Sequence, residues 1–238
     1  KGVSKKDIKN FLDSQEIYQI TKKNNKKQNS FIPRFPLQEF QIDLIYLENR
    51  HLNKASYGLC CIDVFTKKAD IELIKNKTAG EVAIAMQKIL SRMGIPKMMY
   101  CDEGSEFTAN EFKKLMTDNN IEIIFTRNHA PFIERFNRTI KEMLEKYLRS
   151  TGTKTITNVL PQLLRNYNNT VNTSTGLAPN KIDKDNEHIA QFNIIKRSTQ
   201  VRHTPLSIGD MVRKQIKRGA LDKKYKPKWS TQLYEIRE

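Results

Sequence analysis

Phe40-Gln41-Ile42-Asp43-Leu44-Ile45-Tyr46 is the stretch of this sequence that decides the fold. Apolar and aromatic residues surround a single carboxylate, Asp43, in a pattern typical of a β-strand. A second short apolar run, residues 98–101, ends at Asp102. A third acid, Glu134, lies at the start of an amphipathic helix predicted over residues 133–150. Packing these three segments together would gather three carboxylates.

Three neighbouring carboxylates point to divalent metal, because like charges raise one another's pKa until a cation joins them. Mg²⁺ takes oxygen ligands, and two ions about 3.5–4 Å apart can stabilise the attacking and leaving oxygens of a displacement at phosphorus. If the fold gathers them, Asp43, Asp102 and Glu134 are candidate catalytic acids and metal ligands, and a site with two Mg²⁺ or Mn²⁺ ions would suit phosphodiester chemistry. For any one of these acids alone, a strand-edge or capping role is the alternative.

The surrounding pattern predicts an α/β fold. Strand patterns cover residues 39–47, 57–65, 69–74, 97–101 and 122–125, and helical patterns cover residues 78–93, 110–118, 133–150 and 156–167. Thr78 and Glu81 form a candidate capping box at the start of the first helix, and Gly94 and Pro96 are expected to end it. Three strands followed by alternating strands and helices predict a mixed sheet with an antiparallel start.

Four sequence blocks, in order, resemble the DDE integrase core of retroviruses, retrotransposons and related elements. Residues 134–141 resemble the helix of the catalytic glutamate, and residues 101–107 resemble the second-aspartate motif. Residues 40–44 resemble the first-aspartate strand, and residues 57–66 the strand that follows it. The resemblance implies a ribonuclease-H-like catalytic core and a metal-dependent polynucleotidyl transferase with Asp43, Asp102 and Glu134 as metal ligands. The interval between Asp102 and Glu134 is shorter than this family usually shows.

Further blocks extend the resemblance over nearly the whole chain. Residues 166–170, 175–179 and 184–187 resemble the end of the core in integrases of Maverick/Polinton DNA transposons and virophages. Residues 8–12, 18–20 and 208–213 fit the same group. A retroviral or retrotransposon origin is the alternative within the same chemistry.

Four regions are expected along the chain. Residues 1–30 form an N-terminal helix, predicted over residues 7–18, and a basic linker; residues 31–182 form the catalytic core; residues 183–204 form a connector. Residues 205–238 resemble the start of the small SH3-like or chromodomain-like β-barrel that follows many integrase cores. Because the sequence stops within a strand-like pattern, a longer polypeptide is expected.

The charge of the chain favours a polyanionic partner. A formal net charge of +16 on 238 residues attracts nucleic acid, although a solvated basic surface or an anionic membrane would also fit. No apolar run approaches the roughly 20 residues that span a bilayer. We therefore expect an intracellular protein that acts on nucleic acid, with no membrane partner.

Glu134, Arg138 and Lys141 are spaced by four and three residues, so they share one helix face. Given the resemblance, Arg138 and Lys141 are expected to contact phosphates at the DNA end; an ordinary surface ion pair is the alternative. The other expected DNA contacts are His129, Lys217, Arg218, Lys223 and Lys224, for which a solubilising loop is the alternative reading.

Cysteine and histidine give no zinc pattern, because no pair of His precedes a Cys-x-x-Cys. The zinc-binding domain of many integrases is therefore not expected in this sequence. Cys60 and Cys61 are adjacent on a predicted strand, so their side chains should point to opposite faces of the sheet. All three cysteines are expected to be reduced and structural.

The resemblance implies an integrase that trims the 3′ end of mobile-element or viral DNA and joins it to target DNA. Its expected partners are the element-end DNA, the target DNA and further copies of itself, in a tetramer or larger assembly. The expected location is the nucleus of a host cell, or a virus particle. Two other classes stay open: a ribonuclease-H-like nuclease without strand joining, and an inactive DNA-binding relative.

Replacing Lys141 with Ala should weaken binding of an element-end duplex, because one phosphate contact is lost. A salt titration should show the slope of log affinity against log salt falling by about one. Unchanged affinity at every salt concentration would contradict the contact.

Overall fold

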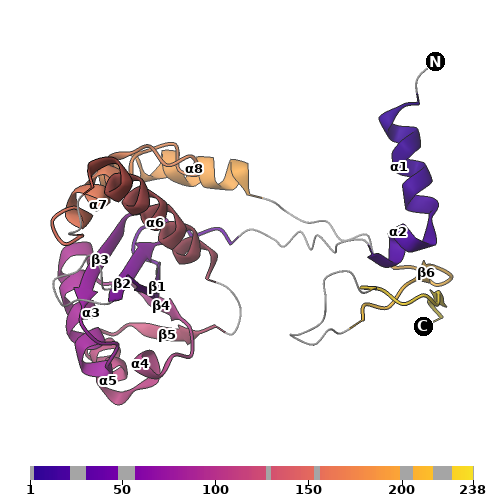
Figure 1. Cartoon of the computed structure of the whole chain (residues 1–238). Coiled ribbons are helices and arrows are strands. Elements are labelled where there is room, and N and C mark those ends of the chain that lie inside the picture. Colours follow the sequence, from indigo (N-terminus) through magenta and orange to yellow (C-terminus); the bar gives the residue numbers. More distant parts are fainter. Residues whose placement is uncertain are drawn as a thin grey trace. The chain divides into compact units, whose positions relative to one another are not determined.

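The computed structural model describes residues 3–21, 31–47, 57–126, 130–152, 156–198, 206–216 and 227–237 (Figure 1). The chain divides into two compact units. Residues 31–198 form one of them, and segments from the two ends of the chain form the other.

A five-stranded mixed sheet is the centre of the larger unit. Its spatial order is β3-β2-β1-β4-β5, with β1 antiparallel to β2, β2 antiparallel to β3, and β4 parallel to both β1 and β5. The strands are β1 (Glu39–Tyr46), β2 (Tyr57–Asp63), β3 (Ala69–Ile74), β4 (Met98–Cys101) and β5 (Glu122–Phe125). The predicted mixed sheet with an antiparallel start is therefore confirmed.

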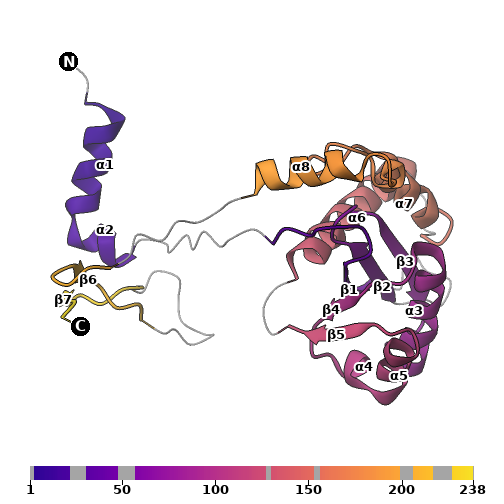
Figure 2. The same ribbon diagram turned by 180° about the vertical axis from the view of Figure 1, so that it is seen from behind.

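Helices cover both faces of this sheet (Figures 1 and 2). The elements on one face are α3 (Ala79–Met93), α4 (Ser105–Thr108) and α5 (Asn110–Asp118), and those on the other are α6 (Pro131–Thr151) and α7 (Leu160–Asn169). No helix among the described residues is both long and apolar enough to cross a membrane.

Strand alternation divides the core into two layers, because successive side chains of a strand point to opposite faces. Phe40 and Ile42 of β1 pack with α3 and α5, whereas Ile45 packs with α6 and α7. Cys61 and Cys60 of β2 divide in the same way, and both are buried free thiols. The predicted opposite orientation of these two cysteines is confirmed.

The ends of α3 follow the sequence signals in part. Thr78 caps the helix by accepting a hydrogen bond from the Glu81 N–H at 3.4 Å, and Gly94 ends it with a φ of 96°. The predicted capping box is only half formed, because the Glu81 carboxylate accepts instead from the N–H groups of Lys75 at 3.0 Å and Asn76 at 2.9 Å.

The connector expected over residues 183–204 contains a helix, α8 (Glu187–Arg197), which follows the short 3₁₀ helix η2 (Pro179–Lys181). Ala190 and Ile194 of α8 pack with Phe65, so α8 belongs to the larger unit. The sequence pattern did not predict this helix. Its other large apolar residues, among them Phe192, are exposed, so the apolar residues do not follow one helix face. The structure therefore places residues 183–198 in the larger unit.

Segments from the two ends of the chain form the smaller unit. It contains α1 (Lys5–Ser14), α2 (Glu16–Thr21), β6 (Met211–Val212) and β7 (Tyr234–Glu235), with β6 antiparallel to β7. The N–H groups of Lys228 and Trp229 donate to the Ile20 carbonyl, and the Arg213 guanidinium donates to the Gln19 side chain. Two regions predicted as separate thus pack together, and the single helix predicted over residues 7–18 is interrupted at Gln15. A two-stranded sheet is what the described residues show here, not a barrel.

Replacing Ile194 with Ala should lower the free energy of unfolding by about 2–5 kcal/mol, since a buried side chain is removed from the α8 contact. Ile195 is the matched control because it is the next residue of the same helix and is 50% exposed, against 7% for Ile194. Urea denaturation should show little change for Ile195→Ala. Equal effects of the two substitutions would contradict the packing of α8.

Candidate active site

Asp43 lies on β1, and Asp102 directly follows β4, the parallel strand beside β1. The register of β1 on β4 pairs Phe40 with Met99 and Gln41 with Tyr100. Continuing this register by two residues brings Asp43 next to Asp102, which directly follows β4. Asp43 is half-buried and Asp102 is exposed. Two of the three predicted acids are therefore close to each other.

The environment of Asp43 disfavours its ionised form. Burial is the main cause that raises the pKa of the Asp43 carboxyl, and the charge of Asp102 raises it further. The Leu44 N–H, the Lys141 ammonium and the Asn137 amide act in the opposite direction, but they do not cancel the rise in pKa. A bound cation would relieve both the desolvation of Asp43 and its repulsion from Asp102.

Side chains of β1 hold the first two turns of α6. The Gln41 Oε1 accepts hydrogen bonds from the N–H groups of Phe132 at 3.1 Å and Ile133 at 3.3 Å, which are free donors of the first helical turn. Gln41 is itself held by its Nε2, which donates to the Glu39 carboxylate at 3.0 Å. One turn further along α6, the Asn137 Nδ2 donates to Asp43 Oδ2 at 2.8 Å.

These contacts determine where the predicted residues of α6 lie. Glu134 is in the first turn, one residue after the Gln41 contact, and its side chain is exposed. Arg138 and Lys141 are also exposed, and the charge of Lys141 lowers the pKa of Asp43. Lys141 therefore lies within electrostatic reach of the acid pair, as the shared helix face predicted.

The structure does not gather all three acids. Within the ranges that it describes, no group of three His, Cys, Asp or Glu side chains is close enough to hold a metal ion. Asp43 and Asp102 come together, whereas Glu134 stays a predicted ligand at the start of α6.

The donor atoms of this site nevertheless fit a hard divalent cation. The Asp43 and Asp102 carboxylates supply oxygen, the ligand that Mg²⁺ prefers. Beside them, the Oδ1 of Asn137 is buried and has no hydrogen-bond partner among the described residues. A buried polar atom without a partner is costly, so an oxygen atom is available near the acid pair.

Glycine at position 104 leaves room for the Asp102 carboxylate. The Gly104 N–H donates to Asp102 Oδ1 at 3.2 Å, and a Cβ at this position would lie 3.1 Å from the same oxygen. The added Cβ would also lie 3.1 Å from Glu106 Oε2. The glycine of the Asp-x-Gly motif therefore suits a close approach of backbone and carboxylate.

Five residues predicted to contact DNA lie outside the described residues: His129, Lys217, Arg218, Lys223 and Lys224. Their roles stay predictions. Sequence reasoning missed Gln41 and Asn137, although a signal for each was present. Gln41 is two residues before Asp43 and so shares its strand face, and Asn137 is three residues after Glu134 on α6.

Residues 34–131 match the integrase core domain family. A putative transposon-derived protein of Caenorhabditis elegans is 30% identical over 182 residues, which are 75% of this chain and 62% of that protein. The Gag-Pol polyprotein of walleye dermal sarcoma virus is 30% identical over 178 residues, 69% of this chain and 10% of the polyprotein. This chain thus spans less than two thirds of the length of either relative.

Two solved structures share the fold. The catalytic core domain of HTLV-2 integrase, determined in complex with magnesium, has a TM-score of 0.55 and 23% identity, and the match covers 62% of this chain and 96% of that one. A chain of the simian T-cell lymphotropic virus intasome, determined with a PP2A regulatory subunit, has a TM-score of 0.62 and 18% identity over 96% of this chain and 80% of that one. The sheet and its helices therefore fit the expected ribonuclease-H-like core, and the family match supports a retroviral-type integrase core domain.

Replacing Gln41 with Leu should lower the free energy of unfolding by about 1–3 kcal/mol, because the N–H groups of Phe132 and Ile133 lose their acceptor. Gln87→Leu makes the same chemical change at an exposed position of α3 and is expected to be nearly neutral. Denaturant titrations of the two variants compare these costs. Equal values would show that Gln41 does not hold α6.

Proposed function

We propose that this protein is a DNA integrase, which processes the 3′ ends of mobile-element or viral DNA and transfers them into target DNA. The observation that carries the proposal is the proximity of Asp43, on β1, to Asp102, at the end of the parallel strand β4, beside the helix that bears Glu134 and Lys141. The integrase core match over residues 34–131 supports the same reaction class, polynucleotidyl transfer.

Asp43, Asp102 and Glu134 would hold two Mg²⁺ or Mn²⁺ ions. When bound, such ions supply stabilisation for the attacking and leaving oxygens of an in-line displacement at phosphorus. Within the protein, Gln41 and Asn137 act as positioning residues, because they attach α6 to β1 through its first two turns.

The basic residues of α6 would bind the DNA end. Lys141 lies close enough to affect Asp43, so a phosphate held by Lys141 and Arg138 would lie near the acids. Water attacks the phosphodiester near the 3′ end of the element, and the resulting 3′-hydroxyl attacks a phosphodiester of the target. No covalent bond between protein and DNA is needed in either step.

Joining two DNA ends to one target requires several copies of the protein, so we expect a tetramer or larger assembly on DNA. The reaction would take place in the nucleus of a host cell, with packaging in a virus particle as a second location. The blocks at residues 166–170 and 175–179 support the Maverick/Polinton and virophage branch of integrases. The pairing of β6 with β7 and the Gln215–Trp229 bridge support the start of an SH3-like or chromodomain-like domain.

A strand-transfer assay tests this function with a labelled element-end duplex, a plasmid target, and Mg²⁺ or Mn²⁺. We expect joined products from the unaltered protein and none from Asp102→Asn, since the substitution removes a metal-binding charge. Glu103→Gln is the matched control: it removes one charge from the neighbouring residue, which the proposed mechanism does not use, and it should retain joining.

Cleavage without joining, abolished by Asp102→Asn, would instead establish a ribonuclease-H-like nuclease. DNA binding with neither activity would identify an inactive relative. Joining that survives Asp102→Asn would contradict the assigned role of this acid.

A further inference from the structure

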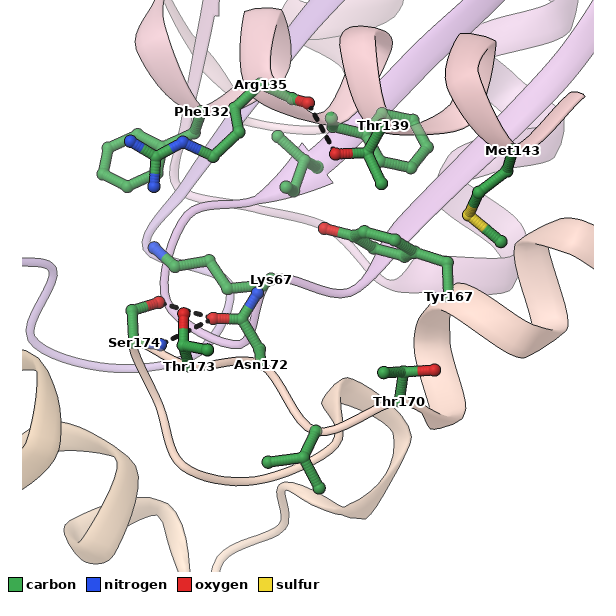
Figure 3. Close-up of a pocket in the computed structure, with 13 residues that line it drawn as sticks. Lys67, Phe132, Arg135, Thr139, Met143, Tyr167, Thr170, Asn172, Thr173 and Ser174 are labelled. Carbon is green, nitrogen blue, oxygen red and sulfur yellow. Dashed lines mark hydrogen bonds between the residues drawn. The ribbon is translucent and has the colours of Figure 1, made fainter. Parts of the chain in front are cut away.

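A cavity of about 350 Å³ lies in the larger unit, between the β2–β3 turn, α6, α7 and the segment after α7 (Figure 3). Its α6 wall includes Phe132, Arg135, Thr139 and Met143. These positions are spaced by three or four residues, and at about 100° per residue they face away from Glu134. The cavity is therefore separate from the acid pair.

Lys67 supplies a buried positive charge at this cavity. Its side chain comes from the β2–β3 turn, is only 5% exposed, and donates to the Val64 carbonyl. The ammonium also lies 3.9 Å from the centre of the Phe132 ring. An ammonium has three N–H donors, so these two contacts leave capacity for a further acceptor.

Arg135 places a second positive charge at the same cavity. Burial is the main cause that lowers the pKa of Lys67 to about 8; Asp63 and Glu39 oppose it, while Arg135 lowers the pKa further. Burial raises the pKa of the Tyr167 hydroxyl on the opposite wall, and the charge of Arg135 opposes part of that rise. Figure 3 shows the ends of the Arg135 and Lys67 side chains on the same side of the cavity, near the Phe132 ring, with the Tyr167 hydroxyl directed toward that side. Repulsion between the two cations is a cost that a bound anion would relieve.

The other polar groups of the cavity can donate hydrogen bonds. Burial raises the pKa of Tyr167 to about 12, so its hydroxyl stays protonated at neutral pH. The Asn172 Oδ1 already accepts from the N–H and the hydroxyl of Ser174, at 2.9 and 2.6 Å, which leaves the Asn172 NH₂ group to donate. No carboxylate lines the cavity, and among the described residues none lies within ion-pair distance of Lys67 or Arg135.

We propose that this cavity binds a phosphate monoester between Lys67 and Arg135, either free phosphate or the terminal phosphate of a nucleic-acid strand. A monoester carries close to two negative charges and three strong acceptor oxygens, which match two cations and several neutral donors. A phosphate within a strand carries one charge and has chain on both sides. A cavity near the lower limit of small-molecule sites has little room for such a strand.

Lys67 could instead have a purely structural role as the counter-charge of the buried Asp63 and Glu39. That role explains fewer of these observations than a bound phosphate does. Asp63 is already hydrogen-bonded by the Phe65 N–H at 2.9 Å and by the Thr66 hydroxyl at 2.8 Å. That role also does not account for Arg135 at the same cavity. In addition, Lys67 has a φ of +65°, a conformation that glycine adopts without strain. A long cationic side chain at this position is consistent with a binding role for the side chain itself.

The test compares a single-stranded trinucleotide carrying a 5′-phosphate with the same trinucleotide carrying a 5′-hydroxyl, by calorimetric titration of the full chain. We expect the 5′-phosphate to strengthen binding about ten- to a hundredfold, the net gain of about one charge-assisted hydrogen bond. Arg135→Gln should abolish this difference. Arg149→Gln removes the same charge from an exposed position near the end of α6 and should preserve it.

A second titration uses inorganic phosphate. It distinguishes the two possible ligands, which are free phosphate and the terminal phosphate of a nucleic-acid strand. If it binds as tightly as the phosphorylated trinucleotide and competes with it, the ligand is free phosphate; weaker competition indicates a strand end. Equal binding of the two trinucleotides by the unaltered protein, with no competition by phosphate, would overturn the proposal. A difference that survives Arg135→Gln would also overturn it.

The pH dependence tests Lys67 even if Lys67→Met does not fold. Asp63 of β2, Glu39 of β1, Arg135 of α6 and Tyr167 of α7 face this ammonium. A phosphate monoester is largely dianionic above pH 7, because its second pKa is about 6. Loss of the Lys67 proton should therefore weaken binding of the phosphorylated trinucleotide about tenfold between pH 7 and 9. An affinity that does not change between pH 7 and 9 would show that Lys67 does not bind the phosphate.

Discussion

The attachment of α6 to β1 is the contact on which both sites depend. Gln41 accepts the N–H groups of Phe132 and Ile133, and the Asn137 amide donates to Asp43 two turns into the helix. Because Gln41, Ile133 and Asn137 are buried, a shift of α6 would leave polar groups unsatisfied at a cost of about 1–3 kcal/mol each. The helix is therefore tied to the strand that carries the first acid, and its residues occupy defined positions around the sheet.

The two faces of α6 border two different sites, the acid pair and the cavity. One face carries Glu134, Arg138 and Lys141 and borders the acid pair, where burial and the charge of Asp102 raise the pKa of Asp43 and favour a bound cation. The other face carries Arg135 and closes a cavity in which two cations and neutral donors favour an anion. The acid pair thus favours a cation and the cavity an anion, although Glu134 and Arg135 are adjacent in sequence.

Particular residues show which parts of the fold were predictable. The strand predicted over residues 39–47 and the glycine that ends α3 depend on local geometry, and the structure agrees with both predictions. Helix α8 escaped prediction because only Ala190 and Ile194 of its residues are buried, by packing against the distant Phe65. The capping box of α3 is only half formed, because the N–H groups of Lys75 and Asn76 donate to the Glu81 carboxylate.

The sequence by itself determined the strands, the main helices and the face of α6 that carries Lys141, because these follow from the periods of strand and helix; it predicted the three acids from the order of the motifs. Only the tertiary structure decided that Asp43 lies beside Asp102, that Gln41 and Asn137 hold α6, and that Lys67 shares a cavity with Arg135. These pairings join residues far apart in the chain, and their burial and charges depend on how the sheet and helices pack. No local pattern encodes that packing.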